Sequence, residues 1–157
     1  MRFLGIDPGL VRTGYAILND KKIIDSGVIT KEGDLIEKIH SITEGLRRII
    51  TTFKPDLVGV ETTFYGKNPK TLIRSAQLIG AIFYLLKDED LEIIQLQPTM
   101  VKKAITGQGR ASKQQIAYMV KKILNINFTL QPDEADALAV ALAIKFHYDR
   151  WDQRKDY

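Results

Sequence analysis

The sequence contains no cysteine, only two histidines and no long hydrophobic run. The absence of cysteine excludes disulfides and cysteine-based zinc sites and is typical of a reducing compartment, so we expect the cytoplasm. The apolar stretch "ALAVALAI" is far shorter than the roughly 20 residues of a membrane-spanning helix, so we expect no membrane association. His40 and His147 fall within predicted helices rather than loops. This placement argues against a histidine-based catalytic triad or zinc site.

Acidic residues are missing from a long central part of the chain. The net charge is only +4, yet no Asp or Glu occurs from Ile93 to Pro132. Between Thr62 and Pro132 there are ten Lys or Arg and four acids, and all four acids fall in "DEDLE". A solvated surface normally mixes both signs of charge. The segregation therefore favours a surface that binds a polyanion.

The length of 157 residues and the hydrophobic content of 45% are those of one domain with a substantial core. We find no internal repeat and no low-complexity linker. The sequence therefore predicts a single domain over residues 1–157, with residues from about 149 to 157 as a frayed tail.

Runs rich in β-branched residues, separated by turn residues, predict five strands. The first three follow one another closely, and the other two alternate with helices. Their ranges are 2–7, 15–19, 23–30, 57–61 and 91–96. Strands enclosed by helices predict an α/β fold with a five-stranded mixed sheet flanked by helices on both faces.

Capping residues mark the starts of the predicted helices. Asp34 and Asn68 are expected as N-caps, Ser112 and Gln115 form an S-x-x-Q capping box, and Pro132 opens the last helix. The helix that follows Asn68 is apolar nearly all round in its second half. One of its sides is expected to meet the core and another a second copy of the chain.

Four acidic residues occupy positions where their carboxylates can converge. Asp7 and Glu61 each end a predicted buried strand, and such ends open onto the usual binding crevice of an α/β sheet. Asp133 and Asp136 are three residues apart and share one face of a helical first turn. Below them this face continues with apolar residues, so Asp136 is expected to point inward.

Carboxylates that converge without a positive partner repel one another by about 4 kcal/mol per pair at 4 Å and an effective dielectric of 20. Hard oxygen ligands without Cys or His suit Mg²⁺ or Mn²⁺, and a pair of such ions is a known arrangement for phosphodiester hydrolysis. Taken singly, each acid has a plainer reading as a turn residue (Asp7), a salt-bridge partner (Glu61) or a helix-start acid (Asp133). An Asp-Gly-rich turn also occurs in actin-like and sugar-kinase ATPases, but this chain is too short for their two domains.

Four segments together resemble one known family. They are "GIDPGLVRTGYA", "VGVETTFYGKNPKT", "QPTMVKKAITGQGRASKQQI" and "DEADALAVALA", and in order and spacing they are similar to the RuvC crossover junction (Holliday junction) endodeoxyribonucleases along almost the whole chain. The resemblance implies an RNase H-like fold, a homodimer, Mg²⁺ dependence and paired symmetric nicks in four-way DNA junctions. It also implies a role in recombination and repair beside a branch-migration helicase. From the acids themselves we expect two Mg²⁺ ions per active site, with Mn²⁺ as a substitute.

The resemblance also assigns roles to individual residues. Asp7, Glu61, Asp133 and Asp136 fall on the acidic catalytic, metal-binding positions, and Lys102 and Lys113 on basic positions linked to DNA binding and cleavage. An aromatic residue that stacks on bases at the crossover corresponds to Phe64, although the neighbouring Tyr65 leaves this choice open. The tail "DRWDQRKDY" is not a family signature.

Further DNA contacts are predicted around these positions. The Gly and Lys of "FYGKN" suit a loop that stacks on bases, and nearby cations would continue a phosphate track. A solvated helix surface is the plainer reading of these cations. The residues are Lys67, Asn68, Lys70, Arg74 and Arg110.

Two other functions stay open from the sequence. One is an RNase H-like nuclease that acts on RNA, as in the related YqgF family. The other is a junction-binding module without catalysis.

Overall fold

The computed structural model describes residues 1–63 and 68–153 and contains one mixed five-stranded sheet. Within it, three consecutive strands pair antiparallel, and two more strands run parallel to the first. The spatial order is β3-β2-β1-β4-β5. The bounds are β1 (Arg2–Asp7), β2 (Arg12–Asn19), β3 (Lys22–Thr30), β4 (Leu57–Glu61) and β5 (Glu92–Leu96). The predicted mixed sheet is confirmed, although β2 begins three residues earlier than expected.

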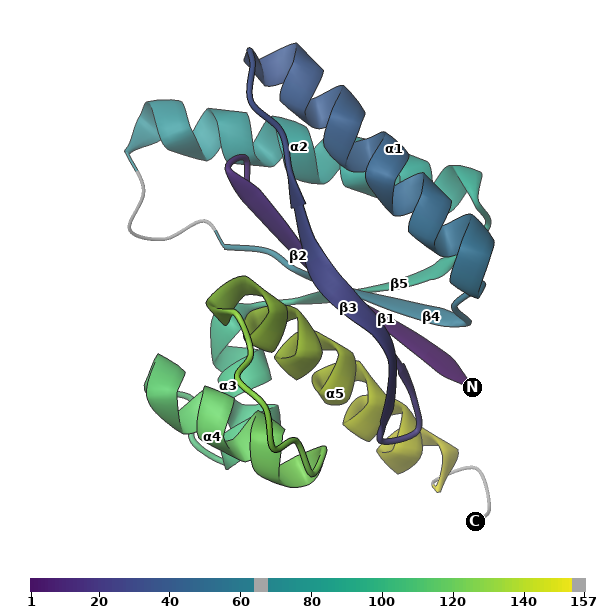
Figure 1. Cartoon of the computed structure of the whole chain (residues 1–157), viewed down its shortest axis with the longest axis vertical. Helices are drawn as coiled ribbons and strands as arrows, with labels where there is room; N and C mark the ends of the chain where they lie inside the picture. Colours follow the sequence, from purple (N-terminus) through teal and green to yellow (C-terminus); the bar gives the residue numbers. More distant parts are fainter. Residues whose placement is uncertain (64–67, 154–157) are drawn as a thin grey trace.

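Five helices are found in the described residues, and they cover both faces of the sheet. Two of them lie above the sheet and three below it in Figure 1, as predicted. Their bounds are α1 (Leu35–Phe53), α2 (Pro69–Asp88), α3 (Pro98–Thr106), α4 (Lys113–Ile123) and α5 (Pro132–Asp152). The segment expected as a frayed tail is helical as far as Asp152, and its residues 154–157 lie outside the described residues.

The predicted helix starts are confirmed by their hydrogen bonds. The Asp34 side chain accepts from the backbone of Glu37, and the Asn68 side chain accepts from that of Thr71. Ser112 and Gln115 exchange the two hydrogen bonds of a capping box. These bonds satisfy amide groups that have no partner inside the helix.

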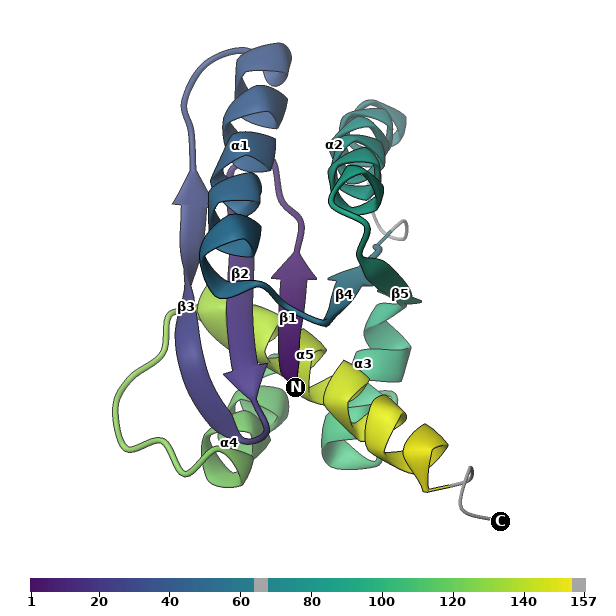
Figure 2. The same cartoon turned by 90° about the vertical axis from the view of Figure 1, so that its right-hand side faces the viewer.

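The strands divide their side chains between two hydrophobic cores. Leu4 and Ile6 of β1 pack with α1 and α2, whereas Phe3 packs on the opposite face with the other three helices. In the second core, the middle of α5 is buried from Ala137 to Lys145, and the helix crosses behind the strands in Figure 2. The alternation follows from the two-residue period of a strand.

Glycines in the sheet allow the backbone of α5 to lie directly on it. A Cβ atom at Gly5 would be 2.3 Å from the carbonyl oxygen of Ala137, and one at Gly14 would be 2.2 Å from that of Asp133. No side chain fits into these spaces. The contact fixes the first turn of α5 above the carboxyl end of β1, and no local sequence pattern predicts it.

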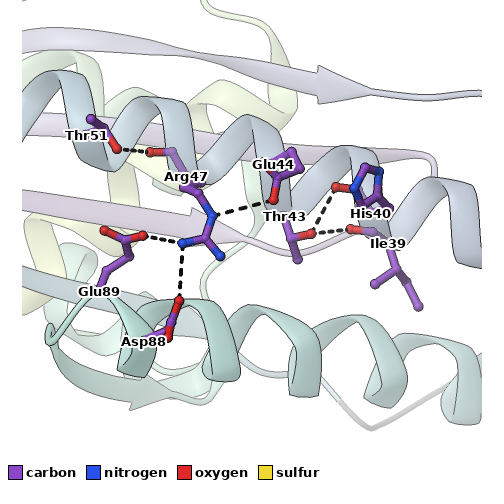
Figure 3. Close-up of polar contacts among 8 residues, drawn as sticks. All are labelled: Ile39, His40, Thr43, Glu44, Arg47, Thr51, Asp88 and Glu89. Carbon is purple, nitrogen blue, oxygen red and sulfur yellow. Dashed lines mark hydrogen bonds and ion pairs between the residues drawn. The ribbon is translucent and has the colours of Figure 1, made fainter.

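An ion-pair network joins α1 to the end of α2 on the other face. Figure 3 shows Arg47 of α1 beside Glu44, Asp88 and Glu89, at 3.5 Å from Glu44 and 3.3 Å from Asp88. The groups are partly exposed, so solvent screening keeps the contribution of each pair to stability small. His40 lies at an exposed position on the same helix, and its backbone carbonyl oxygen accepts a hydrogen bond from the Thr43 hydroxyl.

Over residues 1–63 and 68–153, no helix combines the length and the hydropathy that a membrane crossing requires.

Replacing Gly5 by alanine is expected to lower the free energy of unfolding by about 1–3 kcal/mol, because the new methyl group would overlap the backbone of α5. Urea unfolding followed by circular dichroism measures the change. Gly109→Ala serves as the control, since its Cβ would meet only the carbonyl oxygen of Thr99 at 3.7 Å. Equal stability of the two variants would contradict the close packing described here.

Candidate active site

The sheet places two of the predicted acids side by side. Asp7 is the last residue of β1 and Glu61 the last of β4. These strands are parallel neighbours, and Ile6 is paired with Val60. Asp7 and Glu61 therefore leave the sheet at the same edge, as the sequence predicted.

Three other elements hold the acidic first turn of α5. The Arg12 guanidinium of β2 lies 3.6 Å from the Asp133 carboxylate, and the Lys113 ammonium of α4 lies 3.5 Å from that of Asp136. Between them, the Ser26 hydroxyl of β3 donates to Glu134. The amino-terminal end of a helix also favours negative charge. The turn is thus fixed in place while it carries three acids.

The predicted acids converge on one point. Asp7, Asp133 and Asp136 each offer a carboxylate oxygen within 4.8 Å of the others. Glu61 lies outside this group of three but lines the same pocket as Asp7 and Asp136. The pocket has a volume of about 320 Å³. The structure thus brings all four predicted acids to one site.

The shared burial and charge of these acids change their protonation. Burial, reinforced by the charges of Glu61, Asp136 and Asp133, raises the pKa of Asp7 to about 8. Burial and the charge of Asp136 raise the pKa of Glu61 to about 7. Burial also raises the pKa of Asp136, while Lys113 opposes the rise. Such a site favours a bound cation, because the carboxylates are poorly solvated and repel one another.

Two of the predicted cations lie at this pocket. Lys102 of α3 and Lys113 of α4 both line it, and the charge of Lys102 lowers the pKa of Glu61. Lys113 is the first residue of its helix, where a cation is unfavourable without an anion nearby. Asp136 supplies that anion. Apolar side chains such as Ile79 complete the wall.

The remaining predicted DNA contacts have different positions. Lys70 and Arg74 are exposed on α2, and Arg110 is exposed between α3 and α4. Asn68 caps α2 with its side-chain oxygen. Phe64, Tyr65 and Lys67 lie outside the described residues. Arg12 was not predicted, and an arginine in a glycine-containing turn after Asp7 was the only sequence signal for it.

A five-stranded mixed sheet whose strand-end acids meet acids of the last helix is the arrangement of RNase H-like nucleases. The profile of the family described as crossover junction endodeoxyribonuclease RuvC matches residues 3–144. The chain is 43% identical over 148 residues to the RuvC of Aliarcobacter butzleri, covering 90% of this chain and 96% of that one. It is 42% identical over 151 residues to the RuvC of Caldicellulosiruptor saccharolyticus, covering 90% of both chains. The chain belongs to the RuvC family.

Solved structures agree with this assignment. The Thermus thermophilus RuvC in complex with Holliday junction substrate superposes with a TM-score of 0.89, at 26% identity and with 96% of each chain covered. The yeast mitochondrial Holliday junction resolvase Ydc2 has a TM-score of 0.65 at 14% identity, covering 99% of this chain and 84% of that one. This second likeness shows the fold alone.

The pKa of Asp7 predicts how stability depends on pH without metal. The folded protein keeps this proton up to about pH 8, whereas the ordinary carboxyl pKa is 3.8. The folded state therefore binds more protons between these values, and the free energy of unfolding falls as the pH rises through them. At pH 8 in EDTA, Asp7→Asn is expected to be more stable than the wild type by about 2–5 kcal/mol, with a smaller gain at pH 5.

Thermal unfolding at both pH values measures this gain, and Mn²⁺ should raise the Tm of the wild type more than that of Asp7→Asn. Glu32→Gln, which removes an exposed acid between β3 and α1, is the control. The electrostatic account fails if Asp7→Asn gains no more stability than Glu32→Gln at pH 8.

Proposed function

We propose that this protein is a Mg²⁺-dependent endonuclease that resolves four-way DNA junctions by paired symmetric nicks, in recombination and repair. The observation that carries the proposal is the convergence of Asp7, Asp133 and Asp136 within 4.8 Å. Lys102 and Lys113 lie at the adjoining pocket. Membership of the RuvC family, and the junction complex of the Thermus thermophilus relative, support the choice of substrate.

The donor set fits hard divalent cations. All four candidate ligands are carboxylates, and burial, together with the charge of neighbouring acids, raises the pKa values of Asp7 and Glu61. Such oxygen donors suit Mg²⁺, with Mn²⁺ as a substitute. Two such ions would be held there by Asp7, Glu61, Asp133 and Asp136. Bound there, they would supply an activated water and stabilise the leaving 3′ oxygen.

The residues of the chain have separable tasks in this reaction. Asp7 and Glu61, fixed at adjacent strand ends, define one side of the site, and the first turn of α5 defines the other. Lys113 orients Asp136 and lies close enough to the acids to meet a non-bridging oxygen of the scissile phosphate. Lys102 balances the charge of Glu61 and binds the DNA backbone. Lys102 and Lys113 offset part of the acidic charge, which lowers the repulsion that the DNA strand meets at this centre.

Contacts beyond the pocket would select the junction. We assign base stacking at the crossover to Phe64 or Tyr65. Stacking of an aromatic side chain contributes about 1–3 kcal/mol per base to binding. Phosphate binding is assigned to Lys67, Asn68, Lys70, Arg74 and Arg110.

We propose that a second copy of the chain completes the enzyme, because paired nicks need two sites with matching two-fold symmetry. The exposed side of α2 carries Ile73 and Tyr84, at 61% and 72% exposure, on either side of Gly80. This surface suits close packing against its own copy.

The proposal includes three further points. The chain is a single nuclease domain, its partner is a branch-migration helicase, and it acts in the cytoplasm, where bacterial junctions form.

Asp7→Asn is expected to abolish incision while it preserves junction binding. Removing a shared metal ligand should lower the rate by about 10³-fold or more, and removing a negative charge does not weaken attraction to DNA. Incision of a mobile four-way junction in Mg²⁺, beside gel-shift affinity, measures both effects. The matched control is Asp25→Asn, in an acid of β3 whose partner is Tyr15.

Three results would contradict the proposal. Preferred cleavage of structured RNA at equal Mg²⁺ would favour the RNA nuclease. A wild type that binds junctions but never cuts them in Mg²⁺ or Mn²⁺ would be a binding module. Full incision by Asp7→Asn would remove Asp7 from the active site.

A further inference from the structure

A second hollow opens beside the acids, on the side of Asp133. The turn from Gly9 to Arg12 forms one wall, and α1 and α2 contribute Lys38, Thr71, Arg74 and Ser75 to the other. Asp133 lines this hollow and also belongs to the acidic cluster. We name this hollow, lined by those residues, the flanking groove.

Positive charge gathers in the flanking groove from three separate elements. Arg12 comes from β2, Lys38 from α1 and Arg74 from α2. Among the residues that the structure describes, Asp133 is the only acid that lines the groove, and it is paired with Arg12. Within residues 1–63 and 68–153, Lys38 and Arg74 form no ion pair. The groove therefore keeps an uncompensated positive charge next to the acids.

The turn that presents Arg12 is held rigidly. The Gly9 amide donates to the Thr13 hydroxyl at 3.2 Å, and that hydroxyl donates to the Gly9 carbonyl oxygen at 2.8 Å. Thr13 is fully buried. Arg12 follows this turn with its side chain 56% exposed. A guanidinium has five donors, so Arg12 can bind a second anion while it remains beside Asp133.

The two hollows share no lining residue, and both border the same carboxylate cluster. Lys102 and Lys113 line the first hollow, with Asp7 and Asp136. The cations of the flanking groove line the second, with Asp133. Since Asp7, Asp133 and Asp136 lie within 4.8 Å of one another, a chain of phosphates that crosses the acids meets cations before and after the point of cleavage.

We propose that the flanking groove binds the backbone phosphates of the cleaved DNA strand on the side of the nick opposite Lys102 and Lys113, with Arg12 and Lys38 as phosphate ligands beside Arg74. The proposal rests on the proposed nuclease function and extends it to residues outside the acidic pocket. Cations on both sides of the nick hold the DNA strand over the carboxylates and offset the repulsion between these carboxylates and the phosphates. Loss of the groove therefore weakens binding and misplaces the scissile phosphate without removing a carboxylate ligand.

Salt dependence of binding tests the proposal first. Junction affinity is measured at several salt concentrations for Lys38→Gln/Arg74→Gln, in an Asp7→Asn background that prevents cutting. The loss of two phosphate contacts should reduce the slope of log K against log salt by about 1.4–1.8 and weaken binding about tenfold or more at low salt. The control, Lys21→Gln/Arg48→Gln, removes the same charge from exposed positions outside both hollows.

Neutral methylphosphonates on the cleaved strand give the sharper test. Placed one at a time on either side of the nick, they should weaken wild-type incision on both sides. The Lys38→Gln/Arg74→Gln and Arg12→Gln variants should lose their sensitivity to methylphosphonates on one side of the nick only. The Lys102→Gln variant should lose this sensitivity on the other side.

The outcomes separate the two levels of the account. If the wild type cuts junctions but groove variants match the control in slope and in methylphosphonate pattern, the flanking groove is not a DNA site and the nuclease assignment stands. If the wild type neither binds nor cuts junctions, the nuclease proposal itself fails. Circular dichroism and Tm values equal to those of the wild type ensure that the variants are folded.

Discussion

Repulsion between poorly solvated carboxylates is the interaction around which this structure is arranged. Asp7, Asp133 and Asp136 are held within 4.8 Å of one another, although burial and mutual charge raise the pKa of Asp7 to about 8. Backbone packing maintains this arrangement. Gly5 and Gly14 allow α5 to lie directly on the sheet, so the acids of α5 cannot move away from Asp7 without lifting the helix from the core.

The surroundings reduce the cost of this arrangement without removing it. Arg12 and Lys113 each pair with one acid of α5, and the helix amino terminus favours negative charge. Both cations are largely exposed, at 56% and 80%, so water screens much of their effect. A divalent cation between the carboxylates would neutralise the negative charge that Arg12 and Lys113 leave uncompensated. In the proposed function the same exposed cations also bind phosphates, so that one set of charges would serve both metal binding and DNA binding.

Local sequence signals predicted much of this arrangement, because they act over a few residues. The caps at Asp34, Asn68 and Ser112 marked helix starts, and the acids at Asp7 and Glu61 marked strand ends. The close approach of α5 to Gly5 and Gly14 depends on how distant elements pack, and a glycine in a strand has several explanations. The pairing of Arg12 with Asp133 joins residues 121 positions apart, which no local pattern encodes. The flanking groove likewise forms only when β2, α1 and α2 are packed together in the folded protein.

Crystals of the wild type grown in Mn²⁺, with anomalous diffraction recorded to locate the ions, test the central claim most directly. The account predicts anomalous peaks among the carboxylates of Asp7, Glu61, Asp133 and Asp136, with no such peaks in Asp7→Asn. Mn²⁺ bound elsewhere while these carboxylates stay metal-free at pH 8 would contradict it.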